Sequence, residues 1–277
     1  MRIIASSYAF AVMTELHYTQ EGSGNPVVLL HGLFGSGVNL GSLAKKLAVS
    51  HRVIVADLRN HGRSPHASGM TYVDMAEDLE TLLDRLGIAR ADFVGHSMGG
   101  KAAMVLALTR PHCVRHLVVV DIAPVRYAHS YLPIIQVMEN LDLSRLRSRK
   151  DADRHLAAAV PDDASRMFLL QNLMVQDGRY QWRLNLTAIK QHTDEILGFP
   201  GLTDRSFGGP TLFLAGAQSE YVLEEHRHKI TKLFPAARIE WIAGAGHWVH
   251  VDQPQALFET LQDFLDANPV SAEHESR

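Results

Sequence analysis

Apolar residues follow two alternating patterns along this chain of 277 residues. Short, mostly apolar runs, such as residues 26–30, 52–56 and 114–120, are typical of strands buried on both faces of a parallel sheet. Between them, apolar residues recur every three or four positions, most clearly over residues 71–86, where Gly87 ends the predicted helix. This alternation predicts an α/β protein with a mostly parallel, doubly wound sheet.

Residues 125–205 interrupt the alternation. They contain helical patterns without a buried strand, which predicts a helical cap inserted into an α/β core made of residues 14–124 and 206–268. The cap helices are expected over residues 132–140, 152–159, 164–174 and 186–196. The other expected elements are an edge strand over 14–20, strands over 210–215 and 238–242, a strand leading to Gly95, and helices over 39–48, 99–108, 222–234 and 254–265.

The composition argues against a nucleic-acid-binding, disulfide-stabilised or membrane-spanning protein. With 46% hydrophobic residues, 21% charged residues and a net charge of −3, the chain lacks the basic excess of a nucleic-acid-binding protein. Cys113 has no second cysteine for an intrachain disulfide and is expected to be a buried structural thiol in a cytoplasmic protein. No apolar run approaches the ~20 residues of a membrane span. Residues 1–12 and 269–277 are expected to be peripheral tails, Met13 is a possible start, and the oligomeric state stays open.

The first candidate for chemistry is the serine of a Gly-x-Ser-x-Gly motif. Gly95, Ser97 and Gly99 stand between an apolar run and a small-residue helical segment. A strand, a sharp turn and a helix form the context of a nucleophile elbow, in which the glycines allow the strand and the helix to pass closely. The alternative is a glycine-rich turn with an incidental serine. A base and an acid in suitable positions elsewhere in the chain would favour the nucleophile over this alternative.

A serine hydroxyl needs a base to become a nucleophile, and His247 has the right position for one. It follows the last predicted strand in a glycine-flanked loop, at the sheet edge where ligands of open α/β sheets bind. The chain has sixteen histidines, so position and not mere presence is informative. Those at positions 31, 61, 96 and 250 are expected to be structural or solvent-facing.

The acid that would orient His247 has two candidates. The expected chain order is Ser, then Asp or Glu, then His. Asp121 follows the strand after the elbow helix and is the preferred acid, with Glu220 in reserve. Ser219 is expected to support the triad as a neutral hydrogen-bonding partner. An alternative role for Asp121 is to cap a loop before Pro124.

Two backbone amides are the expected oxyanion donors. One belongs to Met98, directly after the nucleophile at the start of a helix, and the other to Leu33, in a glycine-containing turn after an apolar strand. Phe34 and Trp248 are adjacent candidates for the substrate pocket.

Other charged clusters carry weaker signals. A basic run over residues 145–154 is compatible with the phosphates of an acyl-coenzyme A, although a solvated helix face is the simpler interpretation. His226 and His228 are two residues apart and would lie on different faces of a helix, so no metal site is predicted.

The chain resembles the α/β-hydrolase fold family, and more closely its YbfF-type bacterial esterases and abhydrolase-domain relatives. The matching stretches are residues 31–36, 57–62, 95–101, 120–125 and 244–250. The sequences Asp-Ile-Ala-Pro at 121–124 and Gly-His-Trp-Val-His at 246–250 are the more particular ones. The resemblance implies a small serine esterase or thioesterase with a helical cap, no cofactor, and Ser97, Asp121 and His247 as the triad. Relatives tend to have Gly-Asn where Ala217 and Gln218 stand, and they share the serine at Ser219.

These observations predict hydrolysis of a small-molecule carboxylic ester or thioester through an acyl-enzyme. The alternatives are related hydrolase chemistry, such as carbon–carbon bond hydrolysis or perhydrolysis, and a non-catalytic ligand-binding protein. A haloalkane dehalogenase is disfavoured because it needs a carboxylate where Ser97 stands. Which residues of the cap face the substrate depends on packing; Leu132, Ile134, Met138, Phe168, Leu169, Met174 and Trp182 are the candidates.

Overall fold

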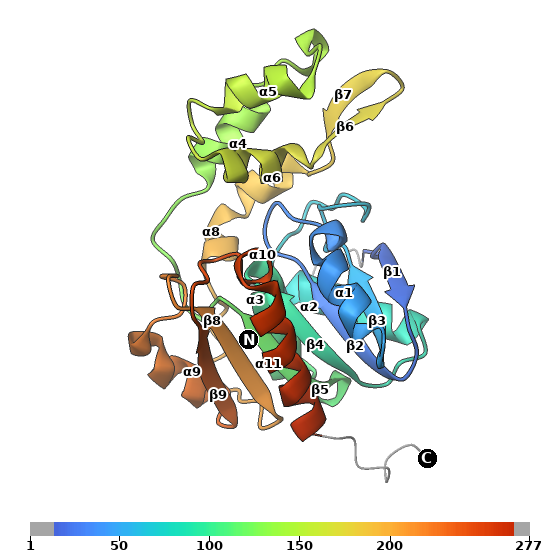
Figure 1. The fold of residues 1–277 in the computed structure, drawn as a ribbon, viewed down its shortest axis with the longest axis vertical. Coiled ribbons are helices and arrows are strands. Elements are labelled where there is room, and N and C mark those ends of the chain that lie inside the picture. The colour runs from blue at the N-terminus through green and yellow to red at the C-terminus, as the bar shows by residue number, and fades with distance from the viewer. Residues whose placement is uncertain (1–13, 269–277) are drawn as a thin grey trace, which may run out of the picture.

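A seven-stranded sheet forms the centre of the molecule (Figure 1). The computed structural model describes residues 14–268, and the expectations for residues 1–12 and 269–277 lie outside the described residues. The strands are β1 (Tyr18–Glu21), β2 (Asn25–Leu30), β3 (His51–Ala56), β4 (Ala91–His96), β5 (Val114–Val120), β8 (Thr211–Gly216) and β9 (Ala237–Ile242). Their order is β1-β3-β2-β4-β5-β8-β9, with β1 antiparallel to β3 and every other pair parallel. The expected doubly wound sheet is confirmed, and its edge strand starts later than expected.

Helices cover both faces of this sheet. They are η1 (Gly37–Leu40), α1 (Gly41–Leu47), α2 (Tyr72–Arg85), α3 (Met98–Thr109), η2 (Pro111–Cys113), η4 (Glu224–His226), α9 (Arg227–Leu233), α10 (Val249–Asp252) and α11 (Pro254–Ala267). Alternate residues of each strand face opposite layers: Leu29 packs with α1 and α11, whereas Val28 and Leu30 pack with α2 and α3. The inner strands are therefore buried on both faces, which explains their mostly apolar runs.

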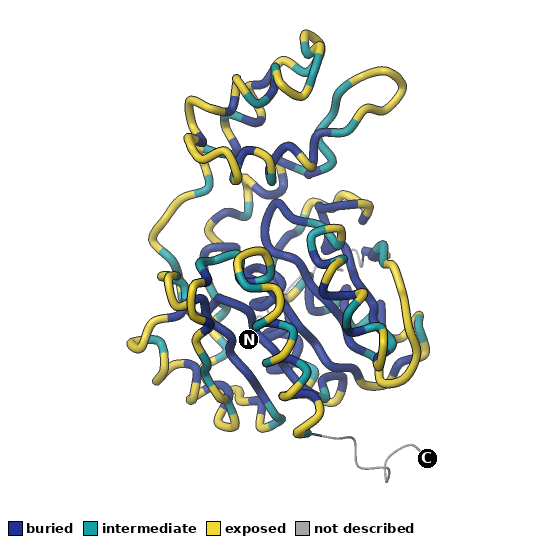
Figure 2. The backbone as a smooth tube through the Cα atoms, viewed as in Figure 1, coloured by how far each residue is buried: buried dark blue, intermediate teal, exposed yellow. Residues whose placement is uncertain are grey.

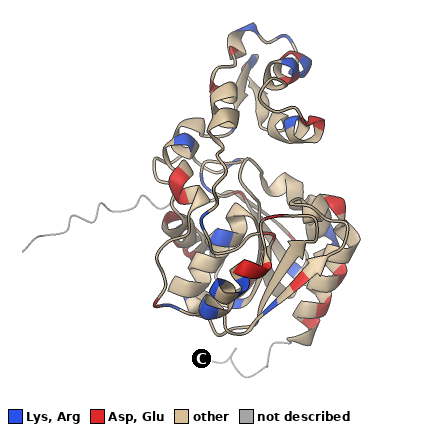
Figure 3. Cartoon of the chain, turned by 90° about the vertical axis from the view of Figure 1, so that its left-hand side faces the viewer, with Lys and Arg blue, Asp and Glu red and all other residues tan. Residues whose placement is uncertain are grey.

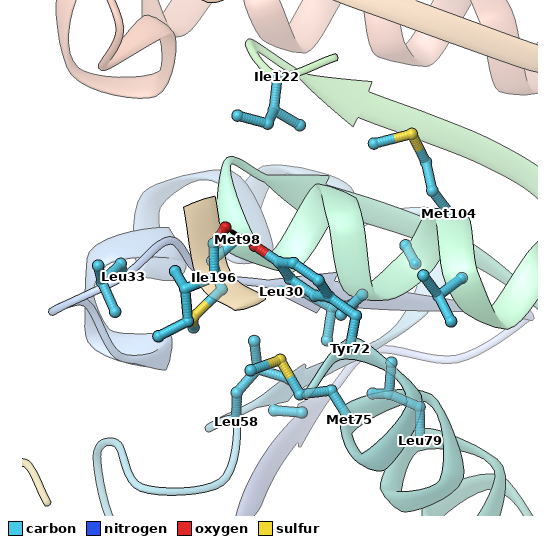
Figure 4. Packing of buried hydrophobic residues seen from close by; sticks show 14 of the residues in the cluster. Leu30, Leu33, Leu58, Tyr72, Met75, Leu79, Met98, Met104, Ile122 and Ile196 are labelled. Carbon is cyan, nitrogen blue, oxygen red and sulfur yellow. Dashed lines mark hydrogen bonds between the residues drawn. The ribbon is translucent and has the colours of Figure 1, made fainter. Parts of the chain in front are cut away.

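Helix α2 illustrates how the sequence builds one of these layers. Thr71 caps its amino terminus by accepting from the Asp74 N–H, while the Asp74 carboxylate accepts from the Thr71 N–H. Its apolar stripe places Tyr72, Met75 and Leu79 in the same buried cluster as Leu30, Leu33 and Met98, as Figure 4 shows.

The segment between β5 and β8 forms a cap that projects from the carboxyl edge of the sheet (Figure 1). Its elements are α4 (Leu132–Glu139), η3 (Leu143–Arg145), α5 (Arg149–Leu156), α6 (Asp163–Leu170), β6 (Leu173–Gln176), β7 (Arg179–Trp182), α7 (Leu186–Gln191) and α8 (Thr193–Leu197). Figure 2 shows that the inner strands β2, β3, β4, β5 and β8 are buried along most of their length, whereas the cap alternates between buried and exposed positions.

Two expectations for the cap are wrong in detail. The helix expected to reach Met174 ends at Leu170, and an antiparallel hairpin of β6 and β7 follows. Asp177 and Gly178 form the hairpin turn, both with positive φ, which is the backbone that an Asp-Gly pair favours. The helix expected over residues 186–196 is two helices, because the backbone leaves the helical region at His192 (φ −106°, ψ 19°).

Among residues 14–268, no helix combines the length and the apolar character needed to cross a bilayer. Cys113 is buried, as expected.

Candidate active site

Ser97 lies at the sharp turn between β4 and α3. Its backbone has φ 51° and ψ −118°, a strained conformation for a residue with a side chain. The neighbouring glycines permit the turn: a Cβ on Gly95 would lie 2.4 Å from the Gly99 carbonyl oxygen, and a Cβ on Gly99 would lie 2.6 Å from the His31 carbonyl oxygen. The Ser97 N–H donates to the Val120 carbonyl at 2.9 Å, which fixes the turn to β5. The predicted elbow geometry is present.

Three side chains from separate loops meet at this turn. The Nε2 atom of His247 lies 3.1 Å from the Oγ atom of Ser97. The Nδ1 atom of His247 lies 2.8 Å from Oδ2 of Asp121. The carboxylate accepts the Nδ1 proton, which leaves Nε2 free to accept a proton from the serine hydroxyl. The order serine, imidazole, carboxylate is that of a hydrolytic triad.

Asp121 is a fully buried carboxylate with three hydrogen-bond donors. Besides His247, it accepts from the Gly216 N–H at 2.9 Å and from the Ser219 hydroxyl at 2.5 Å. These donors compensate the loss of water around a charge that would be costly to bury unpaired. Glu220 points elsewhere: it is exposed and makes no hydrogen bond to His247. The geometry therefore unites His247 with Asp121 and Ser219, and not with Glu220.

The two expected oxyanion donors border the same space as Ser97. Within residues 14–268, neither the Leu33 N–H nor the Met98 N–H makes a hydrogen bond to another protein group. Leu33 belongs to a tight turn closed by a 3.0 Å bond from the Gly35 N–H to the Gly32 carbonyl. Met98 begins α3, where the partial positive charge of the helix terminus favours an anion. Both amides are available to a substrate oxygen.

A cavity of about 190 Å3 opens in front of Ser97. Its core side includes Phe34, Trp248 and His250, and its lining is mostly apolar. The cap contributes Tyr131, Ile134, Val160, Ser165, Phe168 and Leu169. The rings of Phe168 and Trp248 lie 5.3 Å apart, so cap and core meet at the cavity wall. Of the cap residues left open by the sequence, Ile134, Phe168 and Leu169 line the cavity, whereas Met138 belongs to the cap core and Leu132 is exposed.

Neutral histidines support the site from behind. The His96 ring lies 4.8 Å from that of His247 and 4.8 Å from that of His250, and its Nε2–H donates to the His247 carbonyl at 2.8 Å. Burial lowers the pKa of His96 well below its ordinary value and lowers that of His250 to about 4. Burial likewise lowers the pKa of His31, and lowers that of His61 to about 3. The expectation that His31, His61 and His96 are structural agrees with these buried positions, and His31, His96 and His250 also line the cavity.

Tyr221 is a contact of the site that the sequence did not reveal. Its ring stacks on the imidazole of His247, with centroids 3.9 Å apart and planes inclined by 20°. Its N–H donates to the Ser219 hydroxyl, and its hydroxyl lies within hydrogen-bond distance of Tyr131 and His129. A tyrosine two residues after Ser219 was the available signal, but the stack depends on how the loop after β8 folds.

The other candidate clusters lie away from the cavity. Arg145 and Arg154 of the basic run pair with neighbouring aspartates and are largely exposed. Among residues 14–268, the cluster with potential metal-ligand spacing is Glu80, His112 and Cys113. Glu80 already pairs with Arg110, and burial raises the pKa of the Cys113 thiol, so this cluster is poorly suited to holding a metal ion.

Comparisons with known proteins identify the family of the chain. Residues 25–254 match a family model described as alpha/beta hydrolase fold. Over 247 residues, 86% of this chain and 80% of the relative, the chain is 44% identical to the sn-1-specific diacylglycerol lipase ABHD11 of Mus musculus. Over another 247-residue alignment, 89% of this chain and 95% of the relative, it is 38% identical to Esterase YbfF of Escherichia coli. A solved structure of a marine microorganism esterase has a TM-score of 0.88 and 37% identity, covering 91% of this chain and 100% of that one.

Proposed function

Because this chain belongs to the α/β hydrolase fold family and is a carboxylesterase-type serine hydrolase, we propose that Ser97, His247 and Asp121 cleave its substrate through an acyl-enzyme. The observation that carries the proposal is the continuous set of contacts from the Ser97 hydroxyl to the buried Asp121 carboxylate, 3.1 Å and 2.8 Å long. A cavity lined by Leu33 lies on one side of the serine, and a small adjoining pocket is lined by Ser97 and by Leu33 and Met98, whose two backbone amides are unused within the described part of the chain.

In the acylation step, His247 Nε2 takes the proton of the Ser97 hydroxyl as Oγ bonds to the carbonyl carbon of the substrate. The carbonyl π electrons move to oxygen, and the N–H groups of Leu33 and Met98 stabilise that oxyanion. When the carbonyl re-forms, the bond to the leaving group breaks, and the His247 imidazolium protonates the departing alcohol or thiol. Asp121 stabilises the imidazolium while it exists.

In the deacylation step, water replaces the alcohol. His247 takes a proton from the water as its oxygen attacks the acyl carbon, and the second oxyanion occupies the same two amides. Collapse of this intermediate breaks the bond to Ser97 Oγ, and His247 returns the proton to Oγ. The products are the carboxylic acid and the free enzyme.

The apolar cavity supports an ester or thioester of an apolar acyl group as the substrate class. A relative 44% identical to this chain is named an sn-1-specific diacylglycerol lipase, which makes acylglycerols the first substrates to test. A chain-length series of aryl esters, acylglycerols and coenzyme A thioesters, compared by kcat/KM, identifies the acyl length and the leaving group. A preference for the thioester series would move the physiological substrate away from oxygen esters.

The catalytic roles are tested by Ser97→Ala on a short-chain aryl ester. We expect a loss of about 10⁴-fold or more in kcat, because the nucleophile is absent. Ser206→Ala, at an exposed serine, serves as the matched control and keeps full activity. An organophosphonate should form an adduct on Ser97, detected as a mass shift of its peptide. Full turnover in the Ser97 variant would exclude this mechanism, and a product with a cleaved carbon–carbon bond would favour the alternative chemistry.

We also propose a cytoplasmic setting and a small-molecule substrate, with no nucleic-acid partner. The supporting observations are the unpaired Cys113 thiol and the mixed distribution of acidic and basic side chains over core and cap (Figure 3).

A further inference from the structure

Three successive peptide groups of the oxyanion turn are each held by a specific partner. The Gly32 carbonyl, which shares its peptide plane with the Leu33 N–H, accepts from the Nδ1–H of His31 at 2.8 Å and from the Gly35 N–H at 3.0 Å. The next peptide group presents the Phe34 N–H, and the one after it presents the Phe34 carbonyl. Phe34 has φ 61°, a backbone conformation that residues with a side chain rarely adopt, so the turn needs contacts from outside to hold it.

The Phe34 N–H is held from the core by His61. It donates to Nε2 of this fully buried ring at 3.2 Å, while the Nδ1–H of His61 donates to the Arg59 carbonyl at 2.9 Å. This arrangement requires the neutral ring with its proton on Nδ1, because an imidazolium has no acceptor atom.

The Phe34 carbonyl is held from the cap. It accepts from the Nδ2–H of Asn172 at 2.7 Å, and Asn172 is only 3% exposed. Asn172 follows α6, and its own carbonyl accepts the Arg183 N–H of the segment after β7, so it is anchored within the cap. The backbone of Phe34 is thus held on one side by the core and on the other by the cap.

We propose that Asn172 is a positioning residue that couples the cap to the chemical step. Together with His61 it holds Phe34 in its positive-φ conformation, and thereby keeps the Leu33 N–H aimed at the oxyanion. The inference rests on the proposed acyl-enzyme mechanism and adds to it a role for the cap in catalysis as well as in lining the cavity.

Other hydrogen bonds between cap and core allow the role of Asn172 to be compared with cap docking in general. Gln171 accepts from the Asn39 side chain at 2.8 Å in an exposed position, one residue before Asn172. Asn185 donates to the Asn60 side chain at 2.9 Å. Neither bond reaches a peptide group of the turn from Gly32 to Gly35, so Asn172 is distinguished by its acceptor and not by bridging cap and core.

The experiment compares Asn172→Ala with Gln171→Ala on a short-chain ester. We expect Asn172→Ala to lower kcat roughly 10- to 100-fold, less than the loss of a whole oxyanion donor, with KM changed by about twofold or less. Gln171→Ala should change neither constant by more than about twofold. Equal losses in both variants, or a raised KM with unchanged kcat, would overturn the proposal, because they indicate general cap docking or substrate binding.

Two further readouts isolate the oxyanion. The loss in Asn172→Ala should be smaller for a matched thionoester, because its developing charge lies on sulfur, a weak hydrogen-bond acceptor. The isosteric Asn172→Asp cannot donate while ionised, so its kcat relative to the unmodified enzyme should rise as the pH is lowered and the buried carboxyl is protonated. An equal loss for both esters, or a flat relative pH profile, would contradict the coupling.

The failures of the two proposals are distinguishable. Phosphonate labelling of Ser97 in each variant reports the nucleophile, so a labelled enzyme without the expected Asn172 effects contradicts only the coupling. Melting temperatures report folding. If Asn172→Ala is unfolded, Asn172→Asp, which preserves the side-chain volume, decides the outcome.

Discussion

At the residue scale, burial and hydrogen bonding distinguish the two candidate acids, which follow β5 and β8 at the carboxyl edge of the sheet. Asp121 is fully buried and receives bonds from His247, Ser219 and Gly216, whereas Glu220 is exposed. We expect Asp121→Asn to lower kcat about 10³- to 10⁴-fold, because the amide no longer stabilises the imidazolium. Glu220→Gln should stay within about twofold of the unmodified enzyme. Steady-state kinetics of both variants on one ester measures the two losses. A larger loss in Glu220→Gln than in Asp121→Asn would make Glu220 the acid of the triad.

The elbow glycines give a second prediction at this scale. A Cβ on Gly99 would lie 2.6 Å from the His31 carbonyl oxygen and 2.7 Å from the Leu30 Cβ, so the strand or the helix must move. We expect Gly99→Ala to destabilise the fold by about 3 kcal/mol and to abolish most activity. Gly41→Ala is the control: no atom lies within 4 Å of its Cβ, its φ is −60°, and a gain of about 0.5–1 kcal/mol is expected. Urea unfolding measures both, and equal stabilities would refute the steric argument.

At the element scale, Lys101 joins both connections of the cap to the nucleophile helix. Lys101 lies four residues after Ser97 and is almost completely buried. Its Nζ donates to the carbonyls of Val125, where the cap begins, and of Leu197 and Gly198, at the end of α8, and the Ile196 carbonyl lies 3.4 Å away. The ring of Tyr127 lies 4.8 Å from Nζ and adds a cation–π contact. The Ile196 carbonyl also accepts from the Tyr72 hydroxyl, and the Leu197 carbonyl also accepts from the Tyr127 N–H. Lys101 therefore matters most for the carbonyls of Val125 and Gly198, at the two connections of the cap.

We therefore expect Lys101→Met to destabilise the protein by about 2–4 kcal/mol, because methionine leaves the Val125 and Gly198 carbonyls without their donor. Trypsin should also cleave after Arg126 faster than in the unmodified chain, since this connection is no longer held. Lys45→Met, at an exposed position of α1, is the matched control. Unchanged unfolding and cleavage would show that the contacts of Lys101 do not hold the cap.

At the scale of the whole molecule, buried histidines with lowered pKa values reduce the free energy of unfolding at acid pH. His61 has a folded pKa of about 3, lowered by burial and by the neighbouring His31, while Asp57 acts in the opposite direction. Below about pH 6.5 the unfolded chain binds protons that the folded chain excludes, so the free energy of unfolding falls as the pH drops. The same sign holds for His31, His96 and His250, whose pKa values burial also lowers.

The slope of the free energy of unfolding against pH reports how many histidines the folded protein keeps unprotonated. Each histidine excluded from protonation contributes about 1.4 kcal/mol per pH unit between its folded and unfolded pKa values. His61→Gln should therefore reduce the slope between pH 6.5 and 5 by about that amount, even if its stability at pH 7.5 is lower. Urea unfolding at three pH values measures the slope. His155→Gln, exposed on α5, is expected to retain the original slope, and an unchanged slope in His61→Gln would contradict the prediction.

The sequence by itself determined the sheet, the order of its elements and the residues that meet at its carboxyl edge. These features have short-range causes: apolar runs of a strand's length, capped helical stripes, and the glycines around Ser97 that permit one particular turn. The Asp-Gly pair at 177–178 is also a local hairpin signal, but Leu173 and Met174 continue the apolar pattern of α6, so that pattern alone predicts a longer helix in place of β6.

Only the tertiary structure decided which side chains touch across long separations. The preference for Asp121 over Glu220 came from the sequence, but the bond from His247 to Asp121, the stack of Tyr221 on His247 and the bond from Asn172 to the Phe34 carbonyl join residues from distant segments. No local periodicity encodes such contacts, because they depend on how loops after different strands converge and how the cap packs on the core. The hydrophobic pattern specifies the layers, whereas the hydrogen bonds that orient the site follow from the packing of those layers.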